Sequence, residues 1–176
     1  MPITNANIIN HLQVELVDKN IISQKCLDAL TSELKYQTKT WNEETTESAG
    51  NHSEAELSVF IQHYINHAIE AISTKPEQKA TNEAAEDLRK IAAMVLNCYI
   101  QKNDMEQINF LIKSFDYNYA RLPVGEVLLA IQHCLTEINQ AVFRSSKATL
   151  SIFLPAIFAL CCYSMDESGL CILRNS

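Results

Sequence analysis

The sequence predicts an all-α fold, a compact bundle of about seven helices with a central apolar helix near the C-terminus. Three observations indicate this class. Apolar residues recur at i, i+3 and i+4 along most of the 176 residues, which is the period of amphipathic helices. The three glycines are too few for the tight hairpins of an all-β fold or for a phosphate-binding loop. Residues 148–165 carry no charge. At this length we expect one domain over 1–176.

The first two predicted helices form an N-terminal hairpin over 1–36. Apolar residues at helical spacing predict a first helix over Asn5–Asp18, and Lys19 and Asn20 end it. Ser23 is the expected N-cap of the second helix, because a serine hydroxyl oxygen satisfies a free backbone N–H of the first turn. The apolar positions of this second helix are Cys26, Leu27, Leu30 and Leu34.

Residues 37–53 are polar and acidic, and they predict a loop or linker before the main bundle over 54–176. Trp41 is the only large apolar side chain in this segment. Tryptophan is enriched among the residues that dominate binding energy at protein interfaces. Trp41 is therefore a candidate for partner binding, and the segment is where we expect the chain to hinge.

Three helices open the main bundle. Ser53 and Glu56 have the spacing of a capping box, in which each side chain satisfies a backbone N–H group at the helix start. The third helix therefore begins here, and its apolar face extends to Ile72. The fourth helix is predicted over Asn82–Gln101, and Asp104 is the expected N-cap of the fifth.

An aromatic-rich connection follows over residues 116–123. It contains Tyr117, Tyr119 and Arg121 at alternating positions. Tyrosine and arginine, like tryptophan, are enriched at interface hot spots. These three residues are therefore further candidates for partner binding.

The last two helices are predicted over Val124–Phe143 and from Ser146 to Met165, and the tail after them is expected to pack back against the bundle. The uncharged residues 148–165 predict either a helix buried in the bundle or a membrane anchor. The densely apolar part, residues 152–163, is shorter than the roughly 20 residues that span a bilayer. This length favours the buried helix.

One stripe of the third helix carries His63, His67 and Glu70. Two imidazoles one turn apart on a helix can bind a single metal ion. The stripe faces away from the apolar side of the helix, and a solvated polar face explains it more simply. We therefore expect no metal and no cofactor, and these three residues are the only metal candidates.

Six cysteines occur, but no pair is spaced C-x-x-C, which excludes a zinc ribbon and a thioredoxin-like motif. Residues 1–5 have neither the basic nor the apolar region of a secretory signal. We therefore expect reduced thiols in a cytoplasmic protein.

The function suggested by these observations is a protein–protein interaction module: an adaptor, a chaperone-like subunit, or a regulatory or inhibitory subunit. The net charge of -7 without a basic cluster argues against nucleic acid as a partner. Frequent Asn and Ile residues suggest an AT-rich bacterial genome, and with it a secretion accessory protein or an effector that acts in a host cell. A membrane-tethered protein anchored through residues 148–165 is a further hypothesis, and so is a Cys- or metal-dependent enzyme, although no catalytic motif is present.

Overall fold

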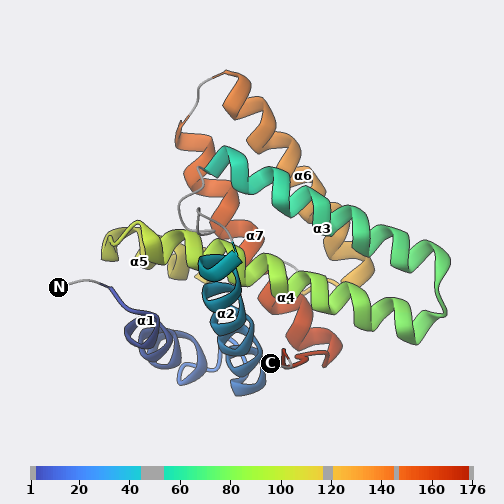
Figure 1. The fold of residues 1–176 in the computed structure, drawn as a ribbon, viewed down its shortest axis with the longest axis horizontal. Coiled ribbons are helices and arrows are strands. Elements are labelled where there is room, and N and C mark those ends of the chain that lie inside the picture. Colours follow the sequence, from blue (N-terminus) through green and yellow to red (C-terminus); the bar gives the residue numbers. More distant parts are fainter. Residues whose placement is uncertain (1–2, 45–53, 117–120, 145–146, 175–176) are drawn as a thin grey trace.

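The computed structural model describes residues 3–44, 54–116, 121–144 and 147–174. Within these ranges every regular element is helical, which confirms the predicted all-α bundle (Figure 1). The helices are α1 (Asn5–Leu12), a π-helical segment (Gln13–Val17), α2 (Gln24–Glu44), α3 (Glu54–Thr74), α4 (Glu77–Gln101), α5 (Met105–Lys113), a 3-10 turn (Ser114–Asp116), α6 (Val124–Phe143) and α7 (Lys147–Ser168).

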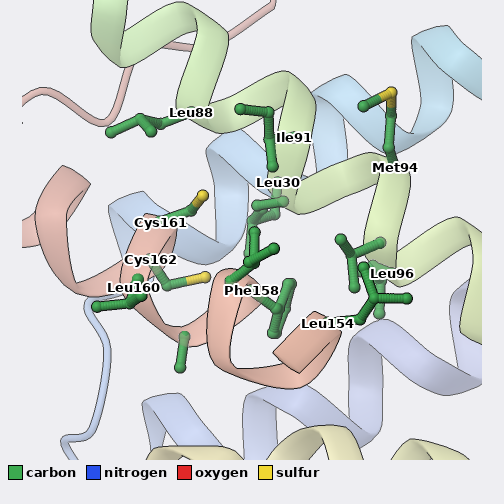
Figure 2. Close-up of a cluster of buried hydrophobic side chains, with 14 of the residues drawn as sticks. Leu30, Leu88, Ile91, Met94, Leu96, Leu154, Phe158, Leu160, Cys161 and Cys162 are labelled. Carbon is green, nitrogen blue, oxygen red and sulfur yellow. The ribbon is translucent and has the colours of Figure 1, made fainter. Parts of the chain in front are cut away.

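Helix α7 lies at the centre of the bundle, as the sequence predicted. Every residue from 154 to 165 is buried, and the helix packs chiefly against α6 and α4. Figure 2 shows Phe158 and Cys161 of α7 close to Leu30 of α2 and Ile91 of α4. In the described parts of the chain, no helix combines the length and the apolar content needed to cross a bilayer.

Helix α4 is a second central helix, and the sequence did not single it out. All residues from 91 to 100 are buried, and α4 packs against α2, α3 and α7. Its first half also buries Asp87 and Arg89. In the sequence, charged residues at these positions indicate an exposed side of the helix. In the structure they are buried because their partners come from α3 and α2.

Helix α2 is longer than expected. A loop was predicted from residue 37, but the helix continues to Glu44. Gln37 is buried, and its Nε2 donates a hydrogen bond to the backbone oxygen of Lys90, 3.1 Å away on α4. Asn5 of α1 donates a hydrogen bond to the hydroxyl of Thr38 at 3.2 Å. Other helices therefore supply partners for this polar stretch that the sequence does not reveal locally. Residues 45–53 of the predicted linker lie outside the described residues.

The local start signals of α2 and α5 are confirmed. The hydroxyl oxygen of Ser23 accepts a hydrogen bond from the backbone N–H of Cys26, 3.0 Å away, and Asp104 accepts one from Glu106 at 2.9 Å. Ser53, the expected cap of α3, lies outside the described residues. The C-terminal tail packs back as predicted: the backbone N–H of Arg174 donates to the hydroxyl of Ser32 at 2.9 Å.

Candidate functional site

Helices α3 and α6 run antiparallel along one edge of the bundle (Figure 1). A reciprocal pair of hydrogen bonds joins them: Gln62 Nε2 donates to Gln132 Oε1 at 2.7 Å, and Gln132 Nε2 donates to Gln62 Oε1 at 3.0 Å. Further along, the Ser58 hydroxyl lies 3.5 Å from Asn139 Oδ1. These contacts set the register in which α3 and α6 pack against each other.

The outward side of α3 carries four uncharged residues. They follow the helical repeat with steps of three and four, and they are Val59, Gln62, Asn66 and Ile69. Val59 is 68% exposed and Ile69 is 40% exposed. Two β-branched apolar side chains therefore stand in solvent on either side of the glutamine that binds α6.

The outward side of α6 also carries exposed uncharged residues. Its members recur on one stripe of the helix, and they are Leu129, Gln132, Thr136 and Phe143. Leu129 is 71% exposed and Phe143 is 92% exposed. A shallow pocket of about 450 Å³ opens beside Phe143, between Asn139, Gln140 and Arg144.

We call these eight residues of α3 and α6 the α3–α6 face. None of them carries a charge. Large apolar side chains with amide and hydroxyl groups between them, and without Lys, Glu or Asp, are typical of the cores of protein interfaces. The eight residues include no carboxylate, imidazole or thiol.

Arg121 is the one predicted partner-binding residue whose side chain the structure describes. Its guanidinium lies over the ring of Tyr163, 4.7 Å from the ring centre, and its Nη2 lies 3.4 Å from the backbone oxygen of Ile21. Arg121 thus joins α7 to the turn before α2. Trp41 belongs to α2 but its side chain lies outside the described part, and so do Tyr117 and Tyr119.

The predicted metal candidates of α3 do not form a common ligand set in the parts of the chain that the structure describes. His67 turns to α4, where its Nδ1 lies 2.6 Å from Oδ2 of Asp87. His63 makes an edge contact with the ring of its neighbour Tyr64. Glu70 is exposed. His67 therefore serves as the hydrogen-bond partner of a buried carboxylate.

The sequence interpretation missed the α3–α6 face, although a signal for it exists. Leu129 and Phe143 are large apolar residues that fall off the buried stripe of their helix. Ile69 lies within the predicted apolar face of α3, which extends to Ile72, but its side chain is 40% exposed. Large apolar residues outside the core-facing stripe of an amphipathic helix indicate an exposed apolar surface.

The sequence and the fold were compared with known proteins. No family model, no curated protein and no solved structure matches the chain. A functional assignment therefore rests on the surface and the side-chain chemistry of the chain itself.

Proposed function

We propose that the chain is a protein–protein interaction module that binds another protein through the α3–α6 face. The observation that carries this proposal is the exposure of Phe143 and Leu129 among uncharged residues of α3 and α6. Burying one such side chain in an interface removes it from water at a gain of about 1.5–3 kcal/mol. An adaptor, a chaperone-like subunit and a regulatory subunit all require a surface of this kind.

Apolar residues exposed elsewhere do not compete with this face. Val14, Phe110, Ile152 and Leu173 are each about half exposed, and they lie on the π-helical segment, α5, α7 and the C-terminal tail, respectively. Scattered apolar residues of this kind are ordinary on protein surfaces, whereas a contiguous patch marks an interaction site. We therefore assign the contact with a partner protein to α3 and α6.

A site-specific crosslink tests the proposal on the full chain in its cell of origin. A photoreactive residue in place of Thr136, in the middle of the face, is expected to capture one protein in stoichiometric yield. The same group in place of Glu106, exposed on α5, is the matched control and is expected to capture none. Equal capture at the two positions would contradict the proposal.

A pair of serine variants then tests the apolar contact itself. Phe143→Ser combined with Leu129→Ser is expected to abolish the crosslink and to leave the melting temperature unchanged, since both side chains stand in solvent. Phe110→Ser on α5 is the control that keeps capture. A double variant that captures the partner as well as the parent chain does would refute the assignment of the face. Identification of the captured band by mass spectrometry also reveals whether the partner is a second copy of this chain.

A further inference from the structure

Three side chains from distant parts of the sequence meet at the beginning of α2. Cys26 lies in the first turn of α2, Asp166 in the last turn of α7, and Cys171 in the tail that follows. Their two Sγ atoms and one carboxylate oxygen all lie within 4.8 Å of one another. The Cys171 Sγ lies 3.4 Å from Asp166 Oδ1. We call these three residues the thiol–carboxylate site.

Backbone geometry and hydrogen bonds hold the three side chains in place. Ser23 donates to both oxygens of Asp166, from its backbone N–H at 2.9 Å and from its hydroxyl at 2.5 Å. Gly169 adopts a positive φ of 68°, a conformation that favours glycine and that ends many helices. This turn sends the chain back past the end of α7, so that Cys171 returns to Asp166.

We propose that Cys26, Cys171 and Asp166 bind a divalent transition-metal ion of the Zn²⁺ class. Zn²⁺ takes thiolate sulfur at about 2.3 Å and carboxylate oxygen at about 2.0–2.2 Å in tetrahedral geometry, which places sulfur and oxygen ligands about 3.5 Å apart. The 3.4 Å between Cys171 and Asp166 matches this spacing. Ser23 then acts as the outer partner that orients the carboxylate, as ligating carboxylates require.

The surroundings leave room for a fourth ligand. The site borders an open pocket of about 460 Å³ whose lining includes Asp166 and Cys171 together with Asn20, Lys25 and Arg121. A water molecule from this pocket completes a three-residue zinc site. Two thiolates and one carboxylate around a divalent ion leave one net negative charge, and the two cationic side chains of the pocket offset it.

Binding exchanges protons for the ion without any redox change. A hydrogen bond with Cys162 raises the pKa of the Cys26 thiol well above its usual value, and a hydrogen bond with Cys26 raises the pKa of the Cys171 thiol. In the ion-free chain the Cys26 thiol donates to the backbone oxygen of Cys162 at 3.8 Å and the Cys171 thiol donates to Asp166 Oδ1 at 3.4 Å. Two S–H bonds break and two metal–sulfur bonds form, and two protons leave to solvent.

Metal titration of the reduced full chain tests the proposal. Equilibrium dialysis with Zn²⁺ and elemental analysis are expected to give one ion per chain. Co²⁺ in place of Zn²⁺ is expected to produce the ultraviolet absorption of cobalt–thiolate bonds. Cys171→Ser is expected to weaken binding at least tenfold, and this change in the half-buried tail leaves the core intact. Cys134→Ser, which alters a buried thiol of α6, is the matched control that keeps full affinity.

Two further variants separate ligand loss from damage to the fold. Cys26→Ser is expected to abolish the cobalt–thiolate absorption band. Asp166→Asn is expected to diminish this band. Zn²⁺ is expected to raise the melting temperature of the parent chain and of Cys134→Ser, but not of Cys171→Ser. The absence of stoichiometric binding, or equal binding by Cys171→Ser and the parent chain, would overturn the proposal. A Cys26–Cys171 disulfide in a chain that binds no ion after reduction would overturn it as well.

Discussion

His67 Nδ1 lies 2.6 Å from Oδ2 of Asp87, and this hydrogen bond joins α3 to α4. The Asp87 side chain is only 1% exposed, whereas half of the His67 side chain is in solvent. Burial raises the pKa of Asp87, and the hydrogen bond with His67 opposes that shift. Lys90 lies 3.9 Å from the second carboxylate oxygen. His67 is therefore the closest partner of a carboxylate that water does not reach.

Replacement of His67 by alanine is expected to destabilise the protein. The change leaves the buried Asp87 carboxylate without its closest partner, which costs about 1–3 kcal/mol. Urea denaturation of the full chain measures the loss. His63→Ala, one turn earlier on the same helix and exposed, is the control and is expected to change the free energy of unfolding by no more than about 0.5 kcal/mol. Equal losses in the two variants would show that the His67–Asp87 bond contributes nothing specific.

Asp87 also predicts a pH dependence of stability. Because its pKa is raised in the folded state, its contribution is fully present below the unfolded pKa of about 3.9 and is lost as pH rises through the folded pKa. Asp87→Asn keeps an oxygen acceptor for His67 but does not titrate. The free energy of unfolding of the parent chain minus that of Asp87→Asn is therefore expected to fall between about pH 4 and pH 7. Urea titrations at both pH values give this difference, and a difference that rises with pH would contradict the assignment.

Arg89 and Glu33 form a buried ion pair between α4 and α2. Arg89 Nε lies 3.4 Å from Glu33 Oε1, and both side chains are almost fully buried. Removal of one member of such a pair costs about 3–5 kcal/mol, since it leaves the remaining charge buried without its partner. Arg174 Nη1 lies 3.8 Å from the same Glu33 oxygen and remains as a partner. Arg89→Ala is therefore expected to cost about 3 kcal/mol, the lower end of this range, in urea denaturation. The matched control is Arg144→Ala at the exposed end of α6, which is expected to change little.

Arg89 also holds the C-terminal tail. Its Nη1 donates a hydrogen bond to the backbone oxygen of Ile172 at 2.6 Å, and the guanidinium of Arg174 lies 3.7 Å from the ring centre of Tyr36. Arg89→Ala is therefore expected to speed amide hydrogen exchange in residues 170–174 as well. Unchanged exchange there, with stability lost, would confine the role of Arg89 to its pair with Glu33.

Phe158 and Phe143 provide a matched pair of phenylalanines, one buried and one exposed, whose replacement is expected to cost very different amounts of stability. Phe158 is fully buried, and its ring meets that of Phe115 edge-on with 5.6 Å between the ring centres. Phe158→Ala is expected to cost about 3–5 kcal/mol through the cavity that it leaves. Phe143→Ala on the exposed face is expected to cost less than about 0.5 kcal/mol. Thermal and urea denaturation measure both, and comparable losses would contradict the assigned positions of α6 and α7.

Local patterns in the sequence determined most of the helices. The apolar period over Val124–Phe143 predicted α6 with the bounds that the structure has, and the caps Ser23 and Asp104 placed the starts of α2 and α5. The uncharged run of residues 148–165 identified the central position of α7. These features depend on neighbours within one or two turns, so the sequence alone carries them.

Tertiary contacts decided the rest. The continuation of α2 through Gln37 and the burial of Asp87 and Arg89 depend on partners from other helices, and no local pattern reveals these partners. The sequence does show that Leu129 lies off the buried stripe of α6. Only the hydrogen bonds between Gln62 and Gln132 show that α3 packs beside this part of α6.

The thiol–carboxylate site depends most on the fold. Cys26 and Cys171 lie near opposite ends of the chain, and no spacing motif links them. They meet because α7 crosses the bundle to the start of α2 and the turn at Gly169 sends the tail back. The sequence by itself therefore determined the helices and their buried faces, because these follow from short-range periodicity. Only the packing of those helices decided which side chains share a site or stand in solvent, because that depends on residues distant in the chain.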